Sequence, residues 1–132
     1  MSQWNLRAAQ LVALALLTIS GSGITLAAEK AQMVRLSKLV IDESQLETYR
    51  AFLKEEVTES MRIEPGVRAL YAVSETDRPT HFTILEIYAD RASYEAHIKS
   101  AHFLKYKTGT KDMVKSLELI DTVPLVANMK IK

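Results

Sequence analysis

The chain has 132 residues, with 17 lysines and arginines against 16 aspartates and glutamates, and it contains no cysteine. This length suits one domain with a small core, and the lack of cysteine excludes disulfides and lipid attachment at a cysteine. Basic and acidic residues are interleaved, so the chain lacks the concentrated basic surface that nucleic-acid binding requires.

The first 28 residues have the layout of a secretory signal peptide: Arg7 precedes an apolar run over residues 8–19, and small residues follow up to Ala28. We expect a signal peptide over 1–28, cleaved near Ala28, and a periplasmic or secreted domain over 29–132. The alternative is an uncleaved anchor, although a membrane span needs about 20 apolar residues. The stretch reaches that length only by including polar residues and glycine.

The first predicted elements are a strand over residues 33–41 (MVRLSKLVI) and a helix after it. Ser44 and Glu47 have the spacing of a capping box, with Asp42 as a competing cap. The helix should end before Pro65. Its apolar positions recur every three or four residues and predict a stripe that faces the core: Leu46, Tyr49, Leu53, Val57 and Met61.

Residues 67–75 and 80–89 are two further strand-like runs, and the turn residues at 76–79 indicate a β-hairpin. Asp90 then caps a second predicted helix, whose residues Tyr94, Ile98 and Ala101 should face inward. We expect Gly109 to interrupt or end this helix. Residues 115–123 form the fourth predicted strand.

The predicted order is β-α-β-β-α-β, which indicates a ferredoxin-like α+β fold with one antiparallel sheet and both helices on one face. In residues 82–88, apolar side chains occur at both even and odd positions, which project from opposite faces of a strand. Both faces of this strand should therefore be buried. A second copy of the sheet is the simplest cover, and we expect a homodimer. A monomer with an uncovered sheet is the weaker alternative.

Three segments carry a resemblance to a known family: "EPGVRALY", "LEIYAD" and "YEAHIKSAHFLKY". With this spacing the chain resembles the antibiotic biosynthesis monooxygenase family over residues 33–124, and most of all its small quinol monooxygenases. The resemblance implies a dimeric α/β barrel with one pocket per subunit, between the sheet and its helices. It also implies oxygenation of a quinol or related phenol by molecular oxygen, without a cofactor or a metal.

Such chemistry needs a base that removes the hydroxyl proton, because the oxyanion gives up an electron more readily; histidine suits this role near neutral pH. His97 lies near the apolar stripe and is the leading candidate, against the alternative of a packed structural histidine. On a regular helix His102 would point about 140° away from His97. It reaches the same pocket only if the helix breaks near Ser100, and is otherwise a surface or dimer-rim residue.

Glu86 stands in the middle of an apolar strand, where a buried carboxylate needs a partner or a raised pKa. We expect it either to assist catalysis with the histidines or to form an ion pair across the dimer interface. The aromatic side chains of Tyr71, Tyr88 and Phe103 are the expected substrate-binding walls.

The sequence gives weaker support to other classes of function. The part of the chain after residue 28 has no glycine-rich phosphate loop, and its three histidines lack the His-Glu-x-x-His spacing of a metal site. Two alternatives to the oxygenase stay open, namely a dimeric module that binds a small aromatic ligand without reaction, and an isomerase of the same family.

Overall fold

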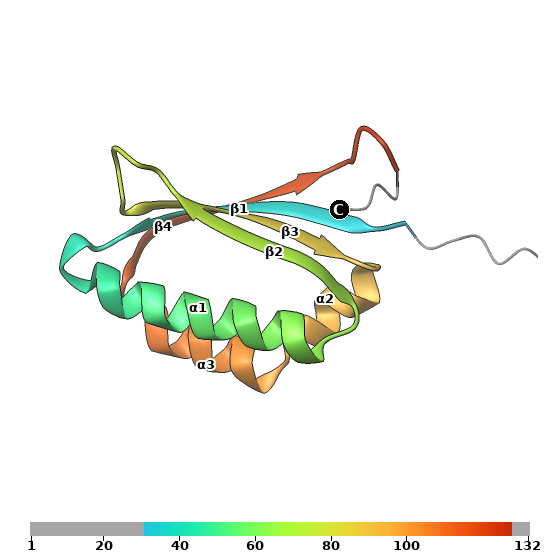
Figure 1. The fold of residues 1–132 in the computed structure, drawn as a ribbon, viewed down its shortest axis with the longest axis horizontal. Coiled ribbons are helices and arrows are strands. Elements are labelled where there is room, and N and C mark those ends of the chain that lie inside the picture. The colour runs from blue at the N-terminus through green and yellow to red at the C-terminus, as the bar shows by residue number, and fades with distance from the viewer. Residues whose placement is uncertain (1–30, 128–132) are drawn as a thin grey trace, which may run out of the picture.

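Figure 1 shows the computed structural model of the chain, which describes residues 31–127. The expected signal peptide over 1–28 lies outside the described residues. The elements in chain order are β1 (Met33–Ile41), the 3-10 turn η1 (Glu43–Gln45), α1 (Leu46–Ile63), β2 (Val67–Ser74), β3 (His81–Tyr88), α2 (Arg91–His97), α3 (Ala101–Thr110) and β4 (Val114–Thr122).

The strands form one antiparallel sheet in the order β2-β3-β1-β4. The α-helices lie on one face of this sheet (Figure 1), where α1 packs against α3 and β2. This is the ferredoxin-like βαββαβ arrangement, so the predicted fold is confirmed. None of the helices within residues 31–127 is long and apolar enough to cross a membrane.

The first helical segment starts on Asp42 rather than on the predicted capping box. The Asp42 carboxylate accepts hydrogen bonds from the Ser44 backbone N–H at 2.9 Å and from the Ser44 hydroxyl at 2.6 Å. This satisfies donors at the start of η1, and the chain continues into α1 without a side-chain cap at Gln45. At the other end α1 stops at Ile63, two residues before Pro65, as predicted.

The second predicted helix is in fact two helices. The chain turns over residues 98–100 between α2 and α3, and the Ser100 side chain caps α3 by accepting a hydrogen bond from the Phe103 backbone N–H at 3.3 Å. Gly109 does not interrupt α3, which ends one residue later at Thr110. The break near Ser100, which was the condition for His102 to reach the pocket of His97, is therefore present.

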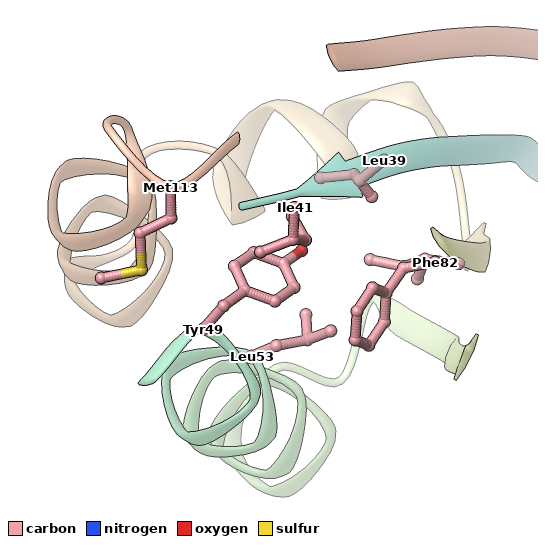
Figure 2. Packing of buried hydrophobic residues seen from close by; sticks show 7 residues of the cluster. Leu39, Ile41, Tyr49, Leu53, Phe82 and Met113 are labelled. Carbon is pink, nitrogen blue, oxygen red and sulfur yellow. The ribbon is translucent and has the colours of Figure 1, made fainter. Parts of the chain in front are cut away.

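The main core lies between the sheet and α1. Tyr49 and Leu53 project from α1 toward the strands, and Met113 closes one side (Figure 2). The Tyr49 ring is fully buried, meets the Phe82 ring edge-on with 5.2 Å between centroids, and shares a hydrogen bond of 2.9 Å with the Tyr106 hydroxyl. Burial of one such aromatic side chain contributes about 1.5–3 kcal/mol, and this cluster ties α1 and α3 to the sheet.

The sheet face opposite the helices carries an apolar row across all four strands. Leu36 of β1 is paired with Leu85 of β3 on one side and with Ile120 of β4 on the other, and Leu85 is paired with Tyr71 of β2. Cross-strand partners project from the same face of a sheet. Tyr71 is 68% exposed within the single chain, so this face stays uncovered by the protomer itself.

The turn between α1 and β2 lies very close to the start of α2. A Cβ atom at Gly66 would lie 2.6 Å from the Cβ of Ser93, and the Gly66 carbonyl accepts a hydrogen bond from the Ala89 N–H at 2.8 Å. Ser93 is fixed in turn by two hydrogen bonds of 2.8 Å to Asp90. A side chain at position 66 would therefore push α2 away from the end of α1.

We expect Gly66→Ala to lower the free energy of unfolding by about 1–3 kcal/mol, as overpacking of a tight contact does. Urea denaturation monitored by circular dichroism measures this change. In a Ser93→Gly background the same substitution should cost much less, because the atoms that it strikes are gone. Equal costs in the two backgrounds would show that the contact does not limit position 66.

Candidate functional site

A cavity of about 520 Å³ lies on the helix side of the sheet. Polar side chains of β1, β3, α1 and α2 line one part of it, further polar side chains come from α3 and the start of β4, and the remaining wall is mostly apolar. The polar members of the lining include Arg35, Ser37, Glu56, Glu86, His97, Thr110 and Ser116 together with three exposed lysines, Lys107, Lys111 and Lys115. The apolar members include Leu39, Leu53, Leu70, Ile84, Phe103, Leu117 and Leu119.

Glu86 lies on the cavity wall and uses both carboxylate oxygens. Its Oε1 accepts a short hydrogen bond from the Ser37 hydroxyl, and its Oε2 accepts one of 2.9 Å from the Tyr88 hydroxyl. Burial raises the pKa of Tyr88 far above its ordinary value, and the neighbouring charge of Glu86 adds to this, so Tyr88 stays a hydrogen-bond donor. The predicted need of Glu86 for a partner is thus met by two hydroxyl groups.

His97 ends α2 and is only 2% exposed. Its Nδ1 lies 3.0 Å from Oε1 of Glu64, and its Nε2 lies 3.5 Å from Oε1 of Glu56. The imidazole ring also packs against two aromatic rings, with centroids 4.9 Å from Phe103 and 5.4 Å from Tyr88. The side chain is therefore held at Nδ1 and by ring packing, in the wall of the cavity.

His102, near the start of α3, meets the same glutamate. Its Nε2 makes a short contact with Oε1 of Glu64 and lies 3.0 Å from the Ser100 hydroxyl. Because the chain turns at Ser100, the rings of His97 and His102 come within 6.3 Å of each other. His102 is not among the residues that line the cavity, so the break in the helix brings it to Glu64 rather than into the cavity with His97.

The pKa values of the two glutamates beside His97 are shifted in opposite directions. Burial disfavours ionisation of Glu64, but hydrogen bonds from His97 and His102 outweigh it and lower the pKa of this carboxyl. Burial raises the pKa of Glu56, although a hydrogen bond of 2.7 Å from Ser60 and the nearby His97 oppose that rise. An ionised carboxylate only accepts hydrogen bonds. In its contact with Glu64, His97 therefore carries the proton on Nδ1.

The structure brings together most, but not all, of the residues predicted for the site. Glu86, His97, Tyr88 and Phe103 line one cavity. Tyr71 was expected in its wall but lies in the apolar row on the opposite face of the sheet, because it stands in register with Leu85 rather than with Glu86.

Sequence reasoning missed both glutamates that hold His97. Glu56 is 5% exposed and lies on the buried side of α1 with Leu53 and Ser60. Glu56 lies about one helical turn from Leu53 and from Ser60, and this spacing was the sequence signal that could have predicted its burial. Glu64 immediately precedes Pro65 at the end of α1, and nothing local in the sequence links it to histidines 33 and 38 positions later.

Together the sheet, the helices on one face and the mostly apolar cavity define a small α+β protein of the ferredoxin-like class. The family model for antibiotic biosynthesis monooxygenases matches residues 33–109. The chain therefore belongs to the antibiotic biosynthesis monooxygenase family, as the resemblance implied.

Solved structures agree with this assignment. A candidate antibiotic biosynthesis monooxygenase from Bacteroides thetaiotaomicron is 60% identical, with a TM-score of 0.76, and the match covers 77% of this chain and 97% of that one. A candidate monooxygenase from Lactobacillus acidophilus is 31% identical over 72% of this chain, with a TM-score of 0.68, and the match spans 47% of the Lactobacillus chain.

A third structure, a candidate antibiotic biosynthesis monooxygenase from Nitrosomonas europaea, shares the fold at 22% identity, with a TM-score of 0.68 over 73% of this chain and 92% of that one. No match was found among curated proteins.

The opposite pKa shifts of Glu64 and Glu56 predict opposite effects of pH on stability. Glu64 has a lowered pKa when folded, so its contribution is present above about pH 4.3, the ordinary glutamate value, and is lost as the pH falls through the folded pKa. Glu56 has a raised pKa, so its contribution is present below about pH 4.3 and is lost as the pH rises through the folded pKa.

We therefore expect Glu64→Gln to lower the free energy of unfolding at pH 7 by about 1–3 kcal/mol, with a deficit that shrinks on acidification below about pH 4.3. Glu56→Gln should gain stability relative to the unmodified protein as the pH rises. Urea denaturation from pH 3 to pH 8 in buffer with EDTA measures both. Parallel pH profiles for the two variants would contradict the assignment.

Proposed function

We propose that this protein is a cofactor-independent monooxygenase that oxidises a quinol or related phenol, with His97 as the base. The observation that carries the proposal is the tautomer of His97, whose side chain lies in the cavity wall. The ionised Glu64 holds the proton on Nδ1, so in the neutral ring Nε2 keeps a free lone pair. Nε2 lies beside Glu56, which also lines the cavity, so a bound hydroxyl group can reach it from there.

The proposed reaction begins when Nε2 of His97 accepts the proton of a quinol hydroxyl. The oxyanion passes an electron to molecular oxygen, the two radicals combine into a carbon–oxygen bond, and the peroxide takes the proton back from His97. Loss of the ring C–H proton then breaks the O–O bond, which leaves a carbonyl on the ring and releases water. One quinol and one dioxygen give one hydroxyquinone and one water, so no outside reductant is needed.

The cavity has features that support this chemistry. Most of its wall is apolar, and the rings of Tyr88 and Phe103 lie next to His97 as aromatic surfaces for the ring of the substrate. Arg35 also lines the cavity, but its guanidinium pairs with Asp121 at 2.6 Å and donates a hydrogen bond of 2.7 Å to the Tyr94 hydroxyl, so it positions Tyr94 in the cavity wall. Glu64 acts as a positioning residue, because it holds the tautomer of His97 without lining the cavity.

Oxygen uptake by the purified protein, measured with an oxygen electrode against the autoxidation of each reduced quinol, tests the proposal. We expect saturable uptake that falls about 10²–10⁴-fold in His97→Gln, the usual contribution of a general base. His81→Gln is the matched control, because His81 begins β3 and lies outside the cavity lining.

Uptake no faster than autoxidation with every quinol, together with a raised melting temperature on adding a quinone, would contradict the oxygenase and support a ligand-binding module. Equal activity in His97→Gln and His81→Gln, with both variants folded by circular dichroism, would refute His97 as the base.

We also propose that the apolar row on the outer face of the sheet is covered by the same face of a second copy. The row runs through Tyr71, Leu85, Leu36 and Ile120, and nothing else in residues 31–127 covers Tyr71, which is 68% exposed. A two-fold pairing of one surface with itself closes the assembly at a dimer.

Tyr71→Lys should raise the dissociation constant of the dimer about tenfold or more, because an ammonium group would lose water without gaining a partner. Because Tyr71 is exposed in the single chain, the protomer should stay folded after this substitution. Sedimentation velocity over a range of concentrations measures the change. Thr58→Lys adds the same charge on an exposed position of α1 and should leave the dimer intact; equal behaviour of the two variants would place the interface elsewhere.

A further inference from the structure

We infer that Glu64, His97 and His102 form a binding site for one divalent transition-metal ion such as Zn²⁺. The three residues come from three different elements, at the C-cap of α1, the last position of α2 and the second position of α3. One ligand atom from each lies within 4.8 Å of the others. The spacing of the histidines along the chain gave no sign of a metal site, because the turn at Ser100 creates the arrangement.

The donors have the chemistry that such ions select. Two imidazole nitrogens and one carboxylate oxygen are a common set for Zn²⁺, Co²⁺ and Fe²⁺, and they leave at least one position open for water. Ligands about 2.0–2.1 Å from a tetrahedral ion are separated from each other by roughly 3.3 Å. Nδ1 of His97 and Oε1 of Glu64 are 3.0 Å apart, so this pair needs to open by only a few tenths of an ångström, whereas the shorter contact between Nε2 of His102 and Oε1 of Glu64 must open further.

The residues that contact the other ring nitrogen of His97 are arranged as around a metal-bound histidine. Metal-bound histidines usually direct their other ring nitrogen at a carboxylate, which fixes the ring and increases its basicity. Here Nε2 of His97 lies 3.5 Å from Oε1 of the buried Glu56, and that oxygen accepts a hydrogen bond of 2.7 Å from Ser60. A simple surface ion pair would not require this second buried carboxylate.

An ion can reach the site from solvent without passing through the cavity. The side chains of Glu64 and His102 are 15% and 11% exposed, whereas that of His97 is 3% exposed. The ion would thus bind between the partly exposed Glu64 and His102 and the buried face of His97. It would join the ends of the three helices in place of the hydrogen bonds that join them now.

Metal binding would also change what His97 can do, a consequence that rests on the proposed function. With Nδ1 bound to an ion, the neutral ring must carry its proton on Nε2. This nitrogen could then donate a hydrogen bond to Glu56 but could no longer accept a proton from a substrate. Metal ions at this site would therefore inhibit the proposed oxidation rather than assist it.

The test uses the purified protein, prepared without a polyhistidine tag and stripped of metal with EDTA. Titration with Co²⁺ should give visible d–d bands that saturate at one equivalent and disappear when Zn²⁺ displaces Co²⁺, and calorimetry should show one Zn²⁺ bound per chain. His102→Gln and Glu64→Gln should abolish the bands. Glu56→Gln should weaken Zn²⁺ binding about 10–100-fold, and His81→Gln should leave it unchanged.

The site is refuted if no saturable Co²⁺ spectrum forms, or if the spectrum persists in His102→Gln and Glu64→Gln. Circular dichroism identifies any variant that fails to fold, and the partly exposed His102 keeps the test valid if substitution of His97 unfolds the chain. Metal binding in a protein that consumes no oxygen would uphold the site and contradict the proposed function. Oxygen uptake without metal binding would do the reverse.

Discussion

The turn at residues 98–100, closed by the cap of Ser100 on Phe103, is the constraint on which the site depends. A continuous helix would direct His97 and His102 about 140° apart. The turn instead brings both rings to one carboxylate, Glu64, at the end of α1. It also places the Phe103 ring against the imidazole of His97. A short change in chain direction thus determines the hydrogen bonds, the ring packing and the charge around the proposed base.

Much of the fold could be predicted from local patterns, because they report which side of each element is buried. The alternation in β1 and the three-to-four spacing in α1 are of this kind, although Met61, the last position of the predicted stripe, is 45% exposed. The sequence predicted one helix where α2 and α3 lie and included a break near Ser100 only as a possibility, because both segments have helical apolar spacing. The face of Tyr71 could not be predicted, because β2 changes register between Val67 and Ala69, and such a shift moves every later side chain to the other face.

The partners of His97 were beyond sequence reasoning for a different reason. Glu64 lies 33 positions before His97, and their contact depends on the packing of α1, β2 and α2 rather than on any spacing. The close approach of Gly66 to Ser93 sets this packing, because it allows the end of α1 and the start of α2 to meet. Family membership predicts the fold and the cavity, whereas the state of each side chain in it follows only from the contacts of this chain.

The edge strand β4 has a consequence for the speed at which ligands exchange. Leu117 and Leu119 face the cavity on the helix side of the sheet, yet they are 56% and 52% exposed. The cavity is therefore open to solvent along this edge. Under the proposed function, a ligand would enter and leave along β4 without breaking the backbone hydrogen bonds that β4 makes with β1, which favours fast exchange.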